Sequence, residues 1–271
     1  MHPLISKSYP KLNIFLKIIG RRDDGFHLLS SRFVLAQGTL FDIISIESSS
    51  MGFVLEGVFG CDIESNTIYK AKCALQELAR SEQCKRVDSH IADFVETLKV
   101  SVQKSIPEGA GLGGGSANAA SFVHSVCALC EIELEREDYA FIARRCGADV
   151  MFFLQRDMSA NVSGIGEEVT PFAEDLPEFE IYTPKLTCST PAVYKAYRES
   201  IAHHDRIFSP LPEKWLSTPS VQLLRTHSLE ELNDLYMSAL LITPELDSVR
   251  TELGSGWFFS GSGSSFFRIK V

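Results

Sequence analysis

The stretch EGAGLGGGSANAA, from Glu108 to Ala120, limits the possible folds of this chain more than any other segment. Glycine occupies five of the seven positions from 109 to 115. Residues 97–103, before this run, alternate in the manner of a strand, and residues 116–130, after it, have the length and alanine content of a helix. The sequence therefore predicts a strand, a tight glycine loop and a helix in direct succession.

A loop of this kind is suited to holding phosphate. Its backbone N–H groups, together with the positive end of the helix dipole, would face one concavity. Side chains would keep phosphate oxygens away from those amides, whereas glycines let the oxygens approach. We therefore predict an anion site formed by residues 107–117.

Three other interpretations of the loop are weaker. The P-loop pattern requires a lysine directly before its hydroxyl residue, but here Gly115 precedes Ser116. The dinucleotide pattern G-x-G-x-x-G matches the letters from Gly109 to Gly114, and Glu131 lies near the distance expected of a ribose-binding acid. The residues between form one helix-like run, however, which leaves no room for the second strand of that fold. A plain tight bend would need only one or two glycines.

The composition of the chain is that of a globular protein with a sizeable core. Of its 271 residues, 45% are hydrophobic and 23% are charged. A net charge of -9 and a pI near 5.3 disfavour nucleic-acid or anionic-membrane partners, because phosphates repel acidic surfaces. The start of the chain lacks the features of a signal peptide, and no segment has the apolar length of a membrane span. We therefore expect a cytoplasmic protein with no nucleic-acid or membrane partner.

The seven cysteines are odd in number and scattered through apolar contexts, which is typical of reduced thiols. His124, Cys127 and Cys130 form an H-x-x-C-x-x-C pattern of the kind found in zinc sites. They lie in one apolar, helix-like run with no second ligand pair nearby. We therefore predict that these residues pack in the core and bind no metal.

Other segments show the periodicities of strands and helices. Apolar and polar residues alternate from Tyr9 to Ile19, which predicts a half-buried strand with Lys11 and Asn13 on one face. Further strands are expected at 41–47, 159–169, 179–184 and on both sides of a turn within 257–269, and helices after Asn66 and at 138–145, 191–198 and 229–241. The helix at 138–145 should end at Gly147, just before Asp149. A domain break is expected near residues 155–159.

The chain resembles the GHMP small-molecule kinases in four blocks, which are SYPKLNIFLKIIGRRDDGFH, KSIPEGAGLGGGSANAA, GADVMFFL and SGSGSSFF. The resemblance covers nearly the whole chain in order. It implies an α+β fold of two GHMP kinase domains, residues 1–157 for ATP binding and catalysis and residues 158–271, with the active site in the cleft between them. The run Ser260 to Ser264 is implied to close over that cleft, although a plain hairpin turn explains it equally well.

The resemblance also implies ATP as phosphoryl donor, with Mg²⁺ held mainly through the nucleotide and Ser116 as a possible protein contact. The residues implied to bind ATP are Asn66, Lys104, Ser105, Pro107, Glu108, Gly109, Ala110, Gly111, Leu112, Gly113, Gly114, Gly115, Ser116 and Ala117. Glu108 departs from the usual methionine, Ala117 from a common serine and Met151 from a usual proline. None of these departures removes a required chemical role.

Asp149 and Lys11 match the catalytic pair of the family. Phosphoryl transfer to an alcohol requires that the attacking hydroxyl be aligned and lose its proton. The resemblance implies that Asp149 accepts this proton, while Lys11 orients the aspartate and stabilises negative charge near the reacting oxygen. Taken singly, a strand lysine usually faces solvent and an aspartate after a helix usually forms a turn or cap.

A separate set of residues implies the acceptor. Phe26 and Tyr194 match two rings that stack on a cytidine base, and His27 matches the residue that reads it. Thr190 fits the pattern beside the second ring, and Asn13 should meet the diphosphate or erythritol end. The implied partner is a small cytidine diphosphate-linked molecule, and the implied reaction is ATP-dependent phosphorylation of the 2-hydroxyl of 4-diphosphocytidyl-2-C-methyl-D-erythritol in non-mevalonate isoprenoid biosynthesis.

Two alternatives to this reaction remain open. The first is a kinase of the same fold that acts on another small alcohol, such as mevalonate or homoserine. The second is a catalytically silent regulator that binds nucleotide. The presence of both Lys11 and Asp149 disfavours the silent regulator, and an aromatic set for a base disfavours the smaller alcohols.

Overall fold

The computed structural model describes residues 2–81, 87–203, 208 and 210–270. The chain forms two compact units that interleave along the sequence. Unit one contains Met1–Tyr9, Thr39–Ile106 and Gly113–Arg156, and unit two contains Pro10–Gly38, Pro107–Leu112 and Asp157–Val271. Both units combine helices with mainly antiparallel sheets, which is the α+β class that the sequence predicts.

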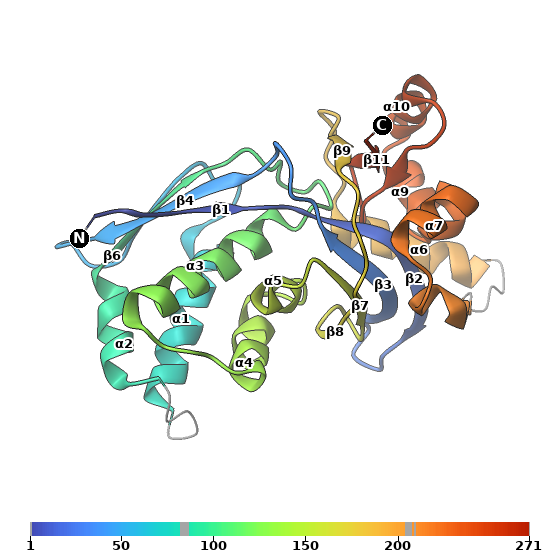
Figure 1. Ribbon diagram of the computed structural model, residues 1–271. Coiled ribbons are helices and arrows are strands. Elements are labelled where there is room, and N and C mark those ends of the chain that lie inside the picture. The colour runs from blue at the N-terminus through green and yellow to red at the C-terminus, as the bar shows by residue number, and fades with distance from the viewer. Residues whose placement is uncertain (1, 82–86, 204–207, 209, 271) are drawn as a thin grey trace. The chain divides into compact units, whose positions relative to one another are not determined.

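Unit one is built on a four-stranded sheet covered by helices on one side (Figure 1). The strands, in spatial order, are β1 (Leu4–Ser8), β4 (Asp42–Ser48), β6 (Leu98–Gln103) and β5 (Val54–Glu56), and only the β5–β6 pair is parallel. The helices are α1 (Thr67–Arg80), α2 (Ser89–Phe94), α3 (Gly114–Cys130), α4 (Arg136–Cys146) and α5 (Val150–Gln155), with short 3₁₀ turns at Ile63–Ser65 and Val95–Thr97. Apolar side chains at alternate positions of β4 and β6, such as Ile44 and Val100, are fully buried beneath the helices.

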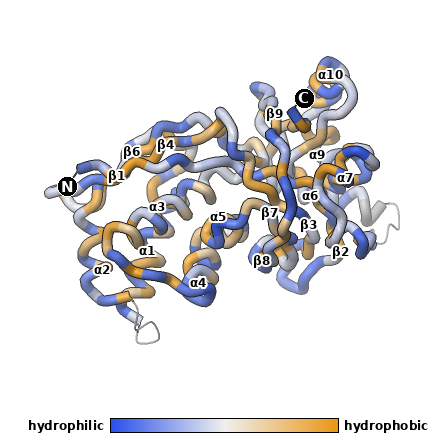
Figure 2. The backbone as a smooth tube through the Cα atoms, viewed as in Figure 1, coloured by the Kyte–Doolittle hydropathy of each residue, from blue (hydrophilic) through white to orange (hydrophobic). Residues whose placement is uncertain are grey.

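The helices of unit one follow from local sequence signals. Asn66 begins α1, because its side chain accepts a hydrogen bond from the backbone N–H of Ile68. Along α1 and α2, apolar and polar stretches alternate (Figure 2), and the apolar side of α1 packs inward. The small side chains of α3, including Ala117 and Ala120, are buried and let α1 approach closely.

Unit two contains two sheets and a group of helices. One antiparallel sheet has the order β2 (Lys11–Arg21), β3 (His27–Leu35), β7 (Ser159–Ser163) and β8 (Glu168–Pro171). The other has the order β10 (Phe258–Phe259), β11 (Phe266–Ile269) and β9 (Phe179–Tyr182). The helices are α6 (Thr190–His203), α7 (Ser220–Thr226), α8 (Leu229–Leu232), α9 (Tyr236–Ile242) and α10 (Glu245–Leu253), and Glu213–Leu216 forms a 3₁₀ turn.

Two expectations about unit two were wrong. The strand predicted at residues 9–19 is not half-buried, since both faces are covered from Lys11 to Ile18. The helix predicted at 229–241 is broken between α8 and α9 at Asn233. The side chain of Asn233 donates hydrogen bonds to the carbonyls of Phe259 and Gly261, and it accepts one from the N–H of Leu235. These bonds hold Asn233 outside helical geometry.

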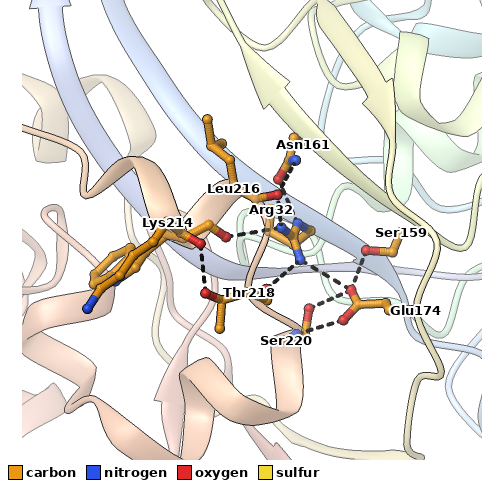
Figure 3. A network of polar contacts seen from close by, with 9 residues as sticks. Arg32, Ser159, Asn161, Glu174, Lys214, Leu216, Thr218 and Ser220 are labelled. Carbon is orange, nitrogen blue, oxygen red and sulfur yellow. Dashed lines mark hydrogen bonds and ion pairs between the residues drawn. The ribbon is translucent and has the colours of Figure 1, made fainter.

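Arg32 ties a long connection of unit two to its central sheet (Figure 3). Its side chain is fully buried on β3, and its guanidinium donates to the carbonyls of Trp215, Leu216 and Thr218. A carboxylate oxygen of Glu174 lies 3.5 Å away and provides the counter-charge. The 3₁₀ turn at Glu213–Leu216 and the residues directly after it are therefore held to the sheet by side chains, chiefly Arg32 with Asn161, rather than by regular strand pairing.

The last passage of the chain from unit one to unit two lies between Arg156 and Asp157, close to the predicted break. Strands β2 and β3 precede that passage yet belong to unit two, where β3 pairs with β7. Within the described part of the chain, no helix combines the length and the apolar character that crossing a bilayer would require.

Candidate functional site

The two units divide the predicted site residues between them. Unit two contains the first half of the glycine loop together with Lys11, Asn13, Phe26, His27, Thr190 and Tyr194. Unit one contains the second half of the loop together with Asn66, Lys104, Ser105 and Asp149. Each group is built on its own framework of strands and helices.

The first half of the glycine loop, residues 107–112, is fixed by bonds to neighbouring backbone. The N–H of Lys11 donates to the carbonyl of Leu112 at 2.9 Å, and the hydroxyl of Ser260 donates to the carbonyl of Gly111 at 3.0 Å. Gly111 has φ +75°, and a Cβ at this position would lie 2.0 Å from the carbonyl oxygen of Ser260. No other residue fits here, because the two backbones touch.

The second half of the loop opens α3. Gly113 adopts the left-handed conformation, with φ 70°, at the position before the helix. Because Gly113 has no side chain, the N-cap position of α3 supplies no side-chain acceptor to the first turn. The backbone N–H groups of this turn therefore remain available to an anion at the positive end of a 17-residue helix. The helix begins at Gly114, two residues before the predicted start.

Asp42 anchors the strand that leads into the loop, and sequence reasoning missed it. Its carboxylate is fully buried at the start of β4. It accepts hydrogen bonds from the N–H groups of Ser105 and Ile106 at 2.7 and 2.8 Å, and from the side-chain amide of Asn118 at 2.9 Å. The ammonium of Lys104 lies 2.5 Å from the same carboxylate. An acidic residue opening an otherwise apolar strand was the signal available in the sequence.

These contacts limit which groups of Lys104 and Asn66, both predicted to bind nucleotide, can bond a ligand. Lys104 is paired with Asp42, so its charge is already largely compensated before any phosphate binds. Asn66 uses its side-chain oxygen to cap α1, which leaves its amide nitrogen as the group able to donate to a ligand. The next residue, Thr67, donates to the carbonyl of Gly115 at 2.6 Å and so joins α1 to the loop.

Asp149 lies where the sequence predicts it, just after α4. That helix ends at Cys146, and Gly147 and Ala148 carry the chain to Asp149 at the entry to α5. The side chain of Asp149 is partly exposed, whereas the α5 residues after it, including Met151, are buried. The carboxylate is thus held at the surface of unit one by a buried helix.

Lys11 and Asn13 lie on the same face of β2, as predicted. The ammonium of Lys11 donates to Asn13 Oδ1 at 2.5 Å, and it lies 4.5 Å from the centroid of the Phe33 ring. Lys11 is only 4% exposed, which is unusual for a lysine and contrasts with the solvent-facing alternative. The strand therefore presents an oriented, largely desolvated cation.

His27 lies in an aromatic cluster with two tyrosines of α6. The imidazole is 5.2 Å from the ring of Tyr194 and 5.9 Å, edge-on, from that of Tyr197. Burial lowers the pKa of His27 below its ordinary value of 6.5, and the nearby charges of Arg198 and Arg21 lower it further. Its Nε2 atom has no hydrogen-bond partner among the described residues. A buried, neutral imidazole with an unpartnered nitrogen is suited to reading a base edge.

Phe26 precedes β3 on the turn at residues 22–26 and is 58% exposed. A large exposed ring costs burial energy in the free protein, so its open face is a surface on which a planar base can stack. Thr190, at the start of α6, has its hydroxyl 2.7 Å from that of Ser262. The small-residue run 260–264 is the buried turn between β10 and β11, and within unit two it contacts the first half of the glycine loop.

The H-x-x-C-x-x-C pattern lies along α3 and has no reactive thiolate character. Burial lowers the pKa of His124 to about 4 and raises that of Cys127 to about 11. His124 is neutral and Cys127 protonated near pH 7, as packing within a helix bundle requires. The six cysteines in the described part of the chain are unbonded thiols, and Cys84 lies outside the described residues.

Comparisons with known proteins identify the family. The model of the GHMP kinases N terminal domain matches residues 66–156, which include α1, the second half of the glycine loop and Asp149. A 4-diphosphocytidyl-2-C-methyl-D-erythritol kinase of Helicobacter pylori (strain HPAG1) is 41% identical over 266 residues, spanning 97% of this chain and 93% of the relative. The chain belongs to the GHMP kinase family. The match spans both units, so the family likeness is not confined to the glycine loop.

Further comparisons are consistent with this family assignment. A relative of the same name from Sulfurimonas denitrificans is 41% identical over 97% of this chain and 96% of its own length. The crystal structure of a 4-(cytidine 5'-diphospho)-2C-methyl-D-erythritol kinase aligns with a TM-score of 0.75 and 31% identity, covering 98% of this chain and 90% of the other. The mevalonate kinase of Methanococcus jannaschii aligns at a TM-score of 0.58 with 14% identity, which shows a shared fold.

Proposed function

We propose that this small-molecule kinase transfers a phosphoryl group from ATP to the 2-hydroxyl of 4-diphosphocytidyl-2-C-methyl-D-erythritol. The observation that carries the proposal is full-length similarity: relatives with this name are about 40% identical over 97% of the chain. The residues of unit two add independent support, because an aromatic cluster around His27 suits a cytidine base and has no purpose for a small aliphatic alcohol.

The donor side of the proposal rests on the glycine loop. The first turn of α3 offers backbone N–H groups that match the needs of a triphosphate. Ser116, in the first turn, would offer its hydroxyl to phosphate or to Mg²⁺. Magnesium, when bound with ATP, neutralises charge on the phosphate oxygens during transfer. Glu108 is exposed at the start of the loop.

In the proposed reaction, Asp149 accepts the proton of the acceptor hydroxyl as that oxygen attacks. Lys11 supplies a positive charge for the developing negative charge around the reacting oxygens. Asn13 holds the ammonium of Lys11 through its Oδ1 atom. The side chains of Phe26 and Tyr194 would stack on the cytidine base while His27 bonds its edge, and Thr190 would contact the same substrate.

The first test is an assay of ADP release with purified protein, ATP and Mg²⁺. We expect ADP with 4-diphosphocytidyl-2-C-methyl-D-erythritol and at least a hundredfold less with mevalonate or homoserine, because a buried polar base site discriminates strongly against ligands that leave it unpaired (order of magnitude). Release of ADP with mevalonate or homoserine alone would favour those kinases. Binding of ATP without release of ADP for any acceptor would favour the silent regulator.

The role of Asp149 gives a second test. We expect Asp149→Asn to lower kcat by about 10³-fold or more, since an amide cannot accept the hydroxyl proton, while ATP affinity stays within about threefold. ADP release measures the first quantity and titration calorimetry the second. Asp138→Asn is the matched control, because Asp138 caps α4 in the same unit. Near-normal turnover of Asp149→Asn would remove the assignment.

A further inference from the structure

A chain of hydrogen bonds links Lys11 to a serine that no part of the proposed reaction uses. Lys11 donates to Asn13 Oδ1 at 2.5 Å, and Asn13 Nδ2 donates to the hydroxyl of Ser31 at 2.9 Å. Ser31 in turn donates to the backbone carbonyl of Phe15 at 2.5 Å. Ser31 lies on β3, is completely buried and belongs to the same unit as Lys11 and Asn13.

The acceptor for Ser31 arises from an irregularity in the sheet. In the β2–β3 pair, Asn13 lies opposite Phe33 and Phe15 lies opposite Arg32, so Ile14 has no partner and the register shifts by one residue. A bulge of this type interrupts the regular ladder of hydrogen bonds. Beside this bulge, the carbonyl of Phe15 accepts a hydrogen bond from the hydroxyl of Ser31.

The direction of these bonds determines the orientation of Asn13. A serine hydroxyl has one proton, and in Ser31 the carbonyl of Phe15 receives it. Ser31 therefore faces Asn13 only as an acceptor, which requires Asn13 to present its Nδ2 atom to Ser31. The opposite atom, Oδ1, must then face the ammonium of Lys11. With the amide reversed, two donor groups would oppose each other.

Phe33 supports the same arrangement from β3. It lies two residues after Ser31, so both side chains are on the face of β3 that meets Lys11 and Asn13. The ammonium of Lys11 is 4.5 Å from the Phe33 ring centroid, a favourable distance for a cation. The backbone N–H of Lys11 is also bonded to Leu112 in the glycine loop. Asn13 and Phe33 thus hold the ammonium of Lys11, Leu112 holds its backbone, and Ser31 acts on the ammonium only through Asn13.

We propose that Ser31 is a positioning residue for phosphoryl transfer: it fixes the amide of Asn13 so that Oδ1 holds the ammonium of Lys11. The inference rests on the proposed function, in which Lys11 stabilises charge at the reacting oxygens. Without the hydroxyl, the amide of Asn13 can rotate and Lys11 loses its directed acceptor. A small displacement of a charge-stabilising group is enough to slow transfer strongly.

The kinetic test compares Ser31→Ala with Ser31→Thr and with the wild type. We expect Ser31→Ala to lower kcat by roughly 10- to 100-fold while KM for ATP stays within about twofold. Ser31→Thr keeps the hydroxyl and should recover kcat to within about threefold of the wild-type value. A wild-type kcat in Ser31→Ala, or failure of Ser31→Thr to recover activity, would overturn the inference. If Ser31→Ala does not fold, Ser31→Cys replaces it, because a thiol keeps the bulk but bonds weakly.

Ser159→Ala is the matched control. Ser159 is 3% exposed on β7, next to β3, and its hydroxyl donates to Glu174. This variant should lower the thermal midpoint as Ser31→Ala does. It should leave kcat within about twofold of the wild-type value, because Ser159 does not contact Asn13. An equal fall in kcat for both variants would show a merely structural effect and contradict the proposal.

A second measurement separates this inference from the proposed reaction. In ¹⁵N–¹H spectra, the side-chain amide protons of Asn13 should exchange with solvent at least tenfold more slowly in wild type than in Ser31→Ala (order of magnitude). Equal exchange rates would overturn the role of Ser31 whatever the substrate is. Failure of the wild type to release ADP, with the difference in exchange intact, would instead contradict the proposed function alone.

Discussion

At the scale of single residues, burial sets the chemistry of the histidine in the proposed base site. His27 is 7% exposed, and two arginines on neighbouring segments add positive potential. All three effects lower its pKa, so the imidazole is neutral at pH 7 and carries one donor and one acceptor nitrogen. Protonation would remove the acceptor and add a charge in a desolvated place.

We therefore expect acceptor affinity to depend on pH. Because the folded-state pKa lies below the ordinary 6.5, affinity is present above that value and is lost as pH falls through the lowered pKa. In Arg198→Gln one of the causes is removed, so the pKa of His27 rises and the loss begins at a higher pH. KM for the acceptor, measured from pH 5 to 8, records this change.

Lys195→Gln is the control for that profile, because Lys195 is an exposed residue of the same helix paired with Glu199. It removes the same charge without facing His27, and its profile should follow that of the wild type. Identical profiles for Arg198→Gln and wild type would show that His27 does not govern acceptor binding.

At the scale of elements, the glycine loop depends on the strand and helix ends that hold it. The buried carboxylate of Asp42 accepts hydrogen bonds from Ser105, Ile106, Asn118 and Lys104. The end of β6, the start of β4 and α3 therefore meet at a single charge. Loop residues that bind through backbone amides need such a rigid base, since they have few side chains to fix them.

Asp42→Asn should test this base. An amide cannot accept from all four donors, and it leaves Lys104 buried without a counter-charge. We expect a loss of about 3 kcal/mol in unfolding free energy and a rise of about tenfold in KM for ATP, with a smaller effect on KM for the acceptor. Urea unfolding and steady-state kinetics provide the two measurements.

Two further variants test the cause of the expected loss in stability. Asp42→Asn combined with Lys104→Met should recover part of the lost stability, because the unpaired charge is removed. Asp88→Asn, at the exposed start of α2, should leave the unfolding free energy close to that of the wild type, because asparagine is also a good N-cap residue. Unchanged stability in Asp42→Asn would contradict the anchoring role.

At the scale of the whole molecule, much of the fold could be predicted and some of it could not. The strand, glycine loop and helix succession follows from local signals, and α4 ends before Gly147 as its sequence indicates. The burial of both faces of β2 could not be predicted, because the alternation of Lys11, Asn13 and Lys17 with apolar residues is also that of an exposed strand. Asp42 and Ser31 were missed because their function lies in long-range contacts.

The predictions about functional and structural residues differ in the same way between local motifs and long-range contacts. Blocks of consecutive residues predict a phosphate loop, a catalytic Asp149 and the Lys11–Asn13 pair, since each motif is local. The break at Asn233 and the buried Arg32 depend instead on partners 28 and 186 residues away in the chain. Contacts between residues so far apart leave no recognisable pattern in a single sequence.

We do not expect the predicted division at residue 157 to separate two pieces that fold alone, because unit two also contains residues 10–38 and 107–112. A fragment of residues 1–157 lacks β7, the partner of β3, and residues 158–271 lack both β2 and β3. Residues 1–157 would expose the unpaired edge of β3 and apolar residues such as Ile14 and Phe33. Residues 158–271 would expose the edge of β7 that pairs with β3. Because unit one lies entirely within residues 1–157, the stronger expectation concerns residues 158–271, which should give no cooperative thermal transition by circular dichroism. A sharp transition in that fragment would contradict this expectation.

The interleaving of the two units also bears on how this loop can change over evolutionary time. The chain passes between units after residues 9, 38, 106, 112 and 156, and the visit of residues 107–112 to unit two is the shortest. Six residues leave one framework, bond to Lys11, Ser260 and Ser265, and return to begin α3. A segment tethered at both ends can exchange side chains, as Glu108 illustrates, but it cannot gain or lose a residue without detaching from one framework. Gaps between related sequences should therefore fall outside it.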